Sequence, residues 1–385
     1  MKLRRLRLFD YRNFERLDLE FTSDIAVIIG DNAQGKSNLL EAAYLLATMR
    51  AVRAETDVQL VRREILSDVQ PAARIVGDAE SGGEPLRVEV AVVAHQGANN
   101  LIARKTVKLN GVPKRIGAAV GRVTAVLFTA DDLEMVTGSP SLRRRFVDIA
   151  LSQVDSEYAA DLRRYEKVLP QRNSLLKRIR EGQAGIAELE FWDEELAKYG
   201  GRILHRRAMA LQKLAKLSAE AHISLASRET LDVRYKPRLD GCEAEALEGL
   251  DSAVEAVAHA LLRGQRRDVA AGMTLNGPHR DDIELTLDGA SASGYASRAQ
   301  QRTIALAIRL AEARFLFDER AEVPLLLLDD ILSEMDASRR ESVLRALSDM
   351  GQMLITGADI DRFPADFAGG AQLLRLVAGR VESLT

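Results

Sequence analysis

The sequence is poor in cysteine and has no long apolar run. Its 385 residues include one cysteine, Cys242, which excludes an internal disulfide and a structural zinc site built from four thiolates. No apolar run approaches the ~18 residues that a membrane-spanning helix requires. Residues 1–10 alternate basic and apolar side chains and lack the apolar segment of a signal peptide. We therefore expect a soluble, cytoplasmic protein without a membrane partner.

Aromatic residues and net charge are also low. The 10 Phe, 7 Tyr and 1 Trp are too few for the rows of base-stacking platforms typical of single-strand binders. The formal net charge is -3, so any binding to nucleic acid has to come from a local basic patch. Because 46% of the residues are hydrophobic, the chain can bury the core of one large domain or two. This composition favours recognition of nucleic-acid backbone or shape over stacking on bases.

The hydrophobic pattern divides the chain into an α/β part, a helical part and a second α/β part. Apolar alternation or continuous apolar runs predict strands near residues 6–8, 17–21, 25–29, 231–235, 323–328 and 353–355. Helical spacing predicts helices over 38–46, most of 141–226, and 254–262. Residues 87–126 alternate like strands, and Asn110-Gly111 within them is typical of a hairpin turn. We expect crossovers between the parts at residues 138–140 and 263–272.

A phosphate-binding loop is predicted between the buried strand at 25–29 and the helix that follows. The pattern G-x-x-x-x-G-K-[ST] is matched by Gly30, Asp31, Asn32, Ala33, Gln34, Gly35, Lys36 and Ser37. The glycines allow main-chain N–H groups to turn toward a phosphate, Lys36 reaches the β and γ phosphates, and Ser37 ligates Mg²⁺. Asn38, the next residue, is included in the predicted nucleotide site. The alternative is a plain glycine-rich turn.

A second element of a phosphate site is an apolar strand that ends in carboxylates. Four leucines at 325–328 are followed by Asp329 and Asp330. Mg²⁺ prefers oxygen ligands, so Asp329 is the predicted metal ligand, and Asp330 is the predicted base that orients the attacking water. The alternative is a strand that simply ends in two aspartates.

Ser297 and Gln300 form a capping-box pattern before an apolar helix. One interpretation is a helix cap and nothing more. The other is that the positive end of this helix points at a γ-phosphate bound by another subunit. Both interpretations remain open from the sequence.

The helical part is basic although the whole protein is acidic. Residues 141–180 carry ten basic and five acidic side chains, a net charge of +5. Five of these cations are the predicted DNA contacts: Arg143, Arg144, Arg145, Arg163 and Arg164. The alternative is a solvated helix face. Lys2, Arg4, Arg5 and Arg7 form a second candidate.

Taken in order, these motifs resemble the ATP-binding-cassette heads of the SMC-like ATPase group and, within it, the RecF family of bacterial recombination proteins. Further similar strings are Tyr11-Arg12-Asn13-Phe14, residues 128–133 and 138–146, and Gly277-Pro278-His279-Arg280-Asp281-Asp282. The resemblance spans nearly the whole chain. It implies an α/β fold, an ABC-type P-loop ATPase head with a helical insertion lobe. Its expected parts are the first head segment at 1–138, the insertion at 139–268 and the second head segment at 269–385.

The resemblance also implies a function and partners. It implies an ATP- and Mg²⁺-dependent homodimer that closes on DNA, with each ATP between the phosphate loop of one subunit and the Ser297 segment of the other. Such proteins hydrolyse ATP slowly with stimulation by DNA, double-stranded and gapped or single-stranded, and help RecR to direct a RecA-type recombinase to gapped DNA. Asp336 would belong to the loop that crosses the dimer interface, and Thr356 would occupy the switch position.

The sequence departs from the family pattern at two places. Ala299 stands where the family signature has Gly, so a Cβ lies where the backbone approaches the partner's phosphate. Thr129-Ala130 stand in the stretch where related heads carry a metal-contacting Gln.

Two alternatives remain open. An ATPase subunit of another ABC-type complex, such as a transporter, would share the phosphate motifs but would not need the basic insertion. Residues 277–282 form either a solvated turn or a segment near the nucleotide or DNA, and His279 there lacks the neighbours of a zinc site.

Overall fold

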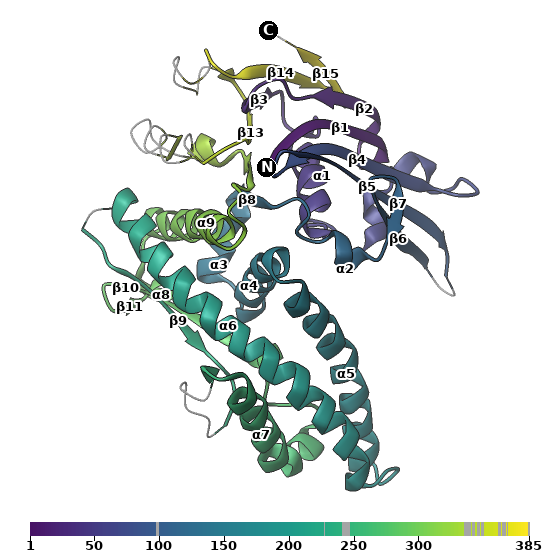
Figure 1. The fold of residues 1–385 in the computed structure, drawn as a ribbon, viewed down its shortest axis with the longest axis vertical. Helices are drawn as coiled ribbons and strands as arrows, with labels where there is room; N and C mark the ends of the chain where they lie inside the picture. The colour runs from purple at the N-terminus through teal and green to yellow at the C-terminus, as the bar shows by residue number, and fades with distance from the viewer. Residues whose placement is uncertain are drawn as a thin grey trace. The chain divides into compact units, whose positions relative to one another are not determined.

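The computed structural model describes residues 1–97, 100–226, 228–240, 247–334, 340, 343–344, 347, 350–360, 363, 367 and 369–383. The chain divides into two compact units (Figure 1). The first unit combines Met1–Asp132 with Glu312–Thr385, and the second is Leu133–Ala311. No helix in the described part of the chain is long and apolar enough to cross a membrane.

The first unit contains an antiparallel sheet with the strand order β2-β1-β4-β5-β6-β7. Its strands are β1 (Lys2–Tyr11), β2 (Phe14–Glu20), β4 (Ala72–Ser81), β5 (Glu84–Gln96), β6 (Leu101–Leu109) and β7 (Val112–Lys114). The Asn110-Gly111 turn joins β6 to the edge strand β7, with Leu109 opposite Val112. The predicted hairpin is confirmed.

A second sheet in this unit has the order β15-β14-β3-β13-β12-β8. Its strands are β3 (Ile25–Ile29), β8 (Ala125–Thr129), β12 (Leu325–Asp329), β13 (Met353–Gly357), β14 (Gln372–Val377) and β15 (Arg380–Ser383). The five strands from β14 to β8 are parallel. Helix α1 (Lys36–Thr48) packs against strands of both sheets, which explains why nearly all of it is buried. The carboxyl ends of the parallel strands meet at one edge, the usual place for a ligand in such sheets.

Short elements connect these strands. They are η1 (Asp57–Leu60), η2 (Arg63–Ile65), α2 (Ile116–Ala119), η3 (Ala130–Asp132) and η7 (Ile331–Glu334).

The second unit is mainly helical. Its helices are α3 (Leu133–Thr137), α4 (Pro140–Val154), α5 (Ser156–Arg180), η4 (Ile186–Leu189), α6 (Glu190–Leu225), α7 (Leu250–Ala271), η6 (Pro278–Arg280) and α8 (Ala292–Tyr295). A small sheet is formed by β9 (Leu231–Lys236), β10 (Asp282–Leu287) and β11 (Ala290–Ser291). Helix α6 packs on α5, α7 and β9 (Figure 1). Helix α9 (Arg298–Arg320) begins in this unit and ends in the first.

The predicted crossover at residues 263–272 is wrong, because α7 continues to Ala271 and ends at Gly272 in a left-handed conformation with φ 66. The helical pattern is hidden there because a charged residue, Asp268, occupies the buried face. The boundaries of the compact units, at residues 132/133 and 311/312, also differ from the expected segment boundaries at 138/139 and 268/269. Residues 269–311 lie in the second unit because β10 pairs with β9, Leu287 opposite Leu231.

Candidate nucleotide-binding site

The phosphate loop lies between β3 and α1, as predicted. Two glycines in it are required by close approaches of the backbone. A Cβ at Gly30 would lie 2.4 Å from the carbonyl oxygen of Leu376, and one at Gly35, where φ is 105, would lie 2.4 Å from the side chain of Asn13. The loop therefore has this shape only with glycine at both positions.

A cavity of about 200 Å³ opens beside this loop. It is lined by Asn32, Ala33, Gly35, Lys36, Ser37, Asn38, Asp329 and Asp330. The Lys36 ammonium donates to the carbonyl oxygens of Gly30 (2.5 Å) and Asp31 (2.9 Å), which holds it above the loop. The side-chain oxygen of Gln34 accepts from the N–H of Ala378 and anchors the loop to the turn after β14.

The predicted metal ligands meet at the carboxyl edge of the parallel sheet. Asp329 ends β12 and lies opposite Thr356 of the adjacent strand β13. The hydroxyls of Ser37 and Thr356 both donate to Oδ1 of Asp329, each at 2.9 Å. Asp329 is 5% exposed. A hydroxyl and a carboxylate at this spacing form an oxygen-only ligand set, which suits Mg²⁺.

Asp330 follows Asp329 and also lines the cavity. Its backbone has φ 52, a conformation that is uncommon for a residue with a side chain. Its N–H donates to the Thr356 hydroxyl (3.0 Å), so one threonine holds both aspartates in place. This conformation turns Asp330 away from the strand direction and toward the cavity that it lines. Its role as the base stays a prediction.

Asn13 and Asn38 clamp the phosphate loop from outside. The Asn13 amide donates to the carbonyl oxygen of Gln34 (3.0 Å), and its own oxygen accepts from the Asn38 amide (2.8 Å). Asn13 belongs to the turn between β1 and β2, within the string that resembles the family. The structure thus gives that string a physical reason: it buttresses the loop.

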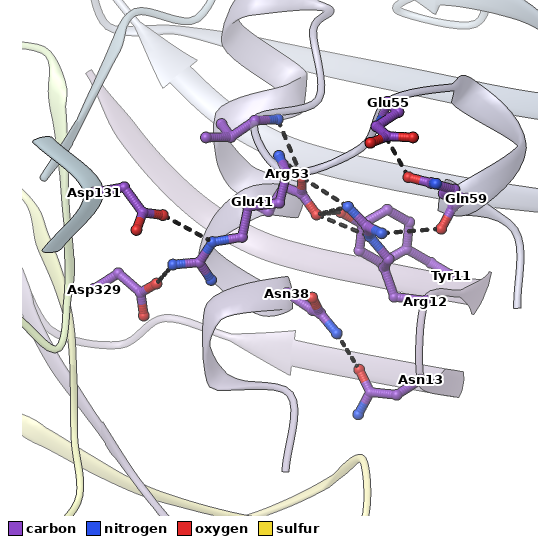
Figure 2. Close-up of polar contacts among 11 residues, drawn as sticks. Tyr11, Arg12, Asn13, Asn38, Glu41, Arg53, Glu55, Gln59, Asp131 and Asp329 are labelled. Carbon is purple, nitrogen blue, oxygen red and sulfur yellow. Dashed lines mark hydrogen bonds and ion pairs between the residues drawn. The ribbon is translucent and has the colours of Figure 1, made fainter. Parts of the chain in front are cut away.

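A buried carboxylate that the sequence analysis did not single out organises this side of the site. Glu41 of α1 is 3% exposed and accepts from the Arg12 guanidinium at 2.7 Å (Figure 2). It also accepts from the backbone N–H groups of Val52 (3.1 Å) and Arg53 (3.0 Å) and from the Tyr11 hydroxyl (3.2 Å). Burial raises the pKa of Tyr11 well above its usual value, so this hydroxyl stays a donor.

Arg53 connects Glu41 with Asp329, the predicted metal ligand, because its N–H donates to Glu41 and its side chain pairs with Asp329. Its Nη2 lies 2.8 Å from Oδ2 of Asp329, and its Nε lies 3.8 Å from Asp131 (Figure 2). Asp131 comes from the stretch after β8 where the family's Gln is missing. Thr129 of the same stretch lies opposite Asp329 in the sheet. This stretch therefore reaches Asp329 through Arg53. No signal in the sequence indicated this contact, because Arg53 and Asp329 lie 276 residues apart.

The Ser297 segment begins α9 with the predicted capping box. Gln300 N–H donates to the Ser297 hydroxyl (3.3 Å), and Ser297 N–H donates to the Gln300 side-chain oxygen (2.7 Å). Ser297, Arg298 and Ala299 are exposed. Asp336, the predicted interface residue, lies outside the described residues.

Two of the predicted DNA contacts are engaged inside the second unit. Arg143 pairs with Asp282 (2.8 Å) and is 12% exposed, and Arg144 donates to the carbonyl oxygen of Asp281 (2.6 Å). The other three, Arg145, Arg163 and Arg164, are exposed. The second candidate patch is paired with carboxylates throughout: Lys2 with Asp24, Arg4 with Glu80, Arg5 with Asp18 and Arg7 with Asp78.

Residues 277–282 are not a solvated turn, which corrects that alternative. Asp281 is fully buried and accepts from Arg207 (3.0 Å), from the Tyr235 hydroxyl and from the N–H of Arg238 (2.8 Å). His279 contacts the Tyr165 hydroxyl at 2.7 Å. Through Asp281, residues 277–282 form hydrogen bonds to side chains of α4, α6 and β9 and so connect these elements within the second unit.

Comparison with known proteins agrees with this architecture. The RecF/RecN/SMC N-terminal domain family matches residues 2–363. The chain is 39% identical to a Chloroflexus aurantiacus protein named DNA replication and repair protein RecF, over 99% of both chains. It is similar to a solved structure of the recombination mediator protein RecF-ATP in the RecFOR pathway, with a TM-score of 0.87 and 32% identity over 100% of this chain and 98% of that one.

A more distant likeness concerns the fold alone. An Smc head bound to the C-winged helix domain of ScpA has a TM-score of 0.52 at 15% identity, covering 100% of this chain and 98% of that one. These findings confirm the predicted α/β fold class, an ABC-type P-loop ATPase head with a helical insertion lobe. The full-length relatives are RecF proteins, and the chain belongs to the RecF family of ATP-binding proteins.

Proposed function

We propose that the protein is an ATP-dependent DNA-binding protein of recombinational repair in the cytoplasm. It dimerises on DNA with ATP, hydrolyses ATP slowly with stimulation by DNA, and helps RecR to direct a RecA-type recombinase to gapped DNA. The names of the relatives, which place them in DNA repair and in the RecFOR pathway, support this proposal. The observation that carries it is the convergence of Ser37, Asp329 and Thr356 beside the phosphate-loop cavity.

The chain's own residues have distinct parts in the proposed reaction. Ser37 and Asp329 would hold Mg²⁺, which when bound neutralises charge on the β and γ phosphates. Lys36 would leave the carbonyl oxygens of its loop to meet the same phosphates. Asp330, which lines the cavity, would accept the proton of the attacking water. Thr356 keeps Asp329 and Asp330 in fixed positions through its single hydroxyl.

The exposed position of Ser297 on its own unit supports the proposed dimer. Ser297, Arg298 and Ala299 are exposed, and an exposed helix start suits a phosphate supplied by another molecule. We propose that this molecule is a second copy of the chain carrying ATP. Ala299 would weaken the closure, because its Cβ stands where glycine would let the backbone approach.

DNA would be held through its phosphates by the exposed cations of the second unit. Arg163 and Arg164 lie on α5, and among the described residues Arg163 has no ion-pair partner. Changing both to Glu should weaken binding for all sequences and flatten its salt dependence. Arg143 is unsuitable for this test, because changing it would break its ion pair with Asp282 and affect the stability of the second unit as well as DNA binding. An unchanged salt slope in the Arg163→Glu, Arg164→Glu variant would place the DNA site elsewhere.

Light scattering with ATP, Mg²⁺ and gapped DNA tests the core of the proposal. The wild-type protein should dimerise only when ATP is present, and Lys36→Ala should stay monomeric. Mixing Lys36→Ala with Ser297→Arg should restore part of the hydrolysis, because one composite site of the mixed dimer is intact. Hydrolysis by a stable monomer, with specific activity independent of concentration, would contradict the proposal.

A further inference from the structure

The start of α9 is held by a side chain from outside its own helix. The Gln300 amide uses both of its ends: its oxygen accepts from Ser297 N–H (2.7 Å), and its nitrogen donates to Oε1 of Glu229 (2.8 Å). A carboxylate only accepts hydrogen bonds. Glu229 therefore decides which way the Gln300 amide points, because the NH₂ group has to face the carboxylate and the oxygen is left for Ser297.

Glu229 is itself fixed from the opposite side. It lies between α6 and β9, and its Oε2 is 3.3 Å from Nε2 of His222. His222 belongs to α6 and is fully buried, and burial lowers its pKa. Among the described residues, its Nδ1 has no hydrogen-bond partner. A neutral ring with the proton on Nε2 satisfies both observations, since a lone pair is cheaper to bury than an N–H group.

These contacts form a continuous line from the buried face of α6 to the surface. His222 orients Glu229, Glu229 orients Gln300, and Gln300 holds the backbone and hydroxyl of Ser297. All four residues belong to the second unit. The Ser297 oxygen acts as an acceptor in the cap, so its O–H proton remains available to donate, and no described residue accepts it.

We propose that Glu229 is a positioning residue for the Ser297 segment, presenting the Ser297 hydroxyl and the first N–H groups of α9 to the terminal phosphate of a nucleotide held by a second copy of the chain. This inference rests on the proposed function and adds a residue to the same composite site. Its chemistry is specific: Glu229 acts through Gln300 and never meets the phosphate. A carboxylate in direct contact there would repel the nucleotide.

The test separates presentation from nucleotide binding. Glu229→Ala removes the acceptor and frees the Gln300 amide to turn, whereas Glu229→Gln keeps an oxygen that can face Gln300. Asp288→Gly is the matched control. Asp288 accepts from the N–H of Thr230, next to Glu229, and its φ of 50 suits glycine, but it does not contact Gln300.

Four properties are measured on the full-length variants: ATP affinity, ATP-dependent dimerisation, hydrolysis in mixtures, and thermal stability. We expect the affinity of the monomer for ATP to be unchanged in all three, because the phosphate loop is in the other unit. We expect ATP-dependent dimerisation to weaken about tenfold in Glu229→Ala, as for the loss of a hydrogen bond to a charged group, and to be within about threefold of wild type in Glu229→Gln and Asp288→Gly. Mixing Glu229→Ala with Lys36→Ala should restore hydrolysis, because one site of the mixed dimer combines the intact phosphate loop of the Glu229→Ala chain with the intact Ser297 segment of the Lys36→Ala chain. Such rescue would show that Glu229 acts on the nucleotide bound by the other subunit.

The outcomes distinguish the proposed function from the positioning role of Glu229. If Lys36→Ala still dimerises with ATP, the proposed function fails. If Lys36→Ala is inactive but Glu229→Ala dimerises like wild type, the function stands and the positioning role is wrong. If Glu229→Ala and Asp288→Gly lose dimerisation and thermal stability together, Glu229 is merely structural and the inference is overturned.

Discussion

The buried pair of Glu41 and Arg12 allows a quantitative prediction about the first unit. Changing Glu41 to Ala removes the acceptor of Arg12, of the Tyr11 hydroxyl and of the N–H groups of Val52 and Arg53. The Arg12 side chain is 16% exposed, so its charge would be left largely buried without a counterion. The helix α1 and the turn before β2 would lose the contact that joins them.

The magnitude follows from the partners left behind. Breaking a buried ion pair by removing one member costs roughly 3–5 kcal/mol. Because Arg12 keeps a hydrogen bond to the carbonyl oxygen of Gln59 (3.1 Å) and some access to water, we expect the lower end, about 3 kcal/mol. Removing both members leaves no unpaired charge. The double variant should therefore be more stable than the sum of the single changes predicts, by about 2 kcal/mol.

Hydrogen exchange is the suitable assay, because two compact units need not unfold in one transition. The amides of α1 and of residues 52–53 report the opening of this region. We expect faster exchange there in Glu41→Ala, a smaller effect in Glu41→Gln, and partial recovery in Arg12→Ala combined with Glu41→Ala. A decrease of less than about 1 kcal/mol in the free energy of opening in Glu41→Ala, or strictly additive effects in the double variant, would refute the reasoning.

Three further predictions concern the nucleotide site and the second unit. Lys36→Ala should lose ATP binding, measured by fluorescent nucleotide titration, because it removes the charge beside the cavity. The melting temperature should fall only slightly, since the lost contacts are the hydrogen bonds to the loop carbonyl oxygens of Gly30 and Asp31. Asp330→Asn should bind ATP normally but hydrolyse it at least ~100-fold more slowly, the effect expected for loss of a general base, so that closed dimers accumulate in light scattering; turnover at the wild-type rate would remove Asp330 from this role. Burial lowers the pKa of His279 from its usual value near 6.5 to about 4, so the unfolded chain binds this proton more tightly. The contribution of His279 to the stability of the second unit is fully present above about pH 6.5 and falls by up to ~3 kcal/mol toward pH 4. In acid unfolding followed by circular dichroism, His279→Gln should lose this part of the pH dependence and keep the part due to His222, whose pKa is also lowered by burial.

The nucleotide site could be predicted because its parts are local or follow a topological rule. The phosphate loop is contiguous, and its flanking strand and helix are evident from the apolar pattern. Asp329 could be placed beside it because parallel strands bring their carboxyl ends to one edge. The role of Thr356 came only from the family resemblance. That role stays a prediction, and the register of β12 and β13 places Thr356 opposite Asp329.

Pairings between distant charges could not be predicted. A period in the sequence shows which face of one element is apolar, but not which cation meets which carboxylate across elements. Arg143 was therefore predicted to contact DNA, yet it is paired with Asp282, and the pairing of Arg53 with Asp329 was not predicted at all. The same limit misplaced the crossover at 263–272, because Asp268 interrupts the apolar face of α7 and is fully buried only through its pairing with Arg172 (2.7 Å).

The buried charges of the second unit have a cost that points to what they do. Arg207 with Asp148 and Asp281, and Arg172 with Asp268, are removed from water, and such pairs often add little net stability because desolvation offsets their attraction. What they do provide is a fixed arrangement, since a helix that slides or rotates leaves a charge unpaired in the interior. Arg207 belongs to α6, the helix that also carries His222 and leads to Glu229. In the proposed dimer, the surface of this unit would offer Ser297 to another molecule within hydrogen-bonding tolerance. That role would need rigid helices more than additional stability, and buried ion pairs are suited to it.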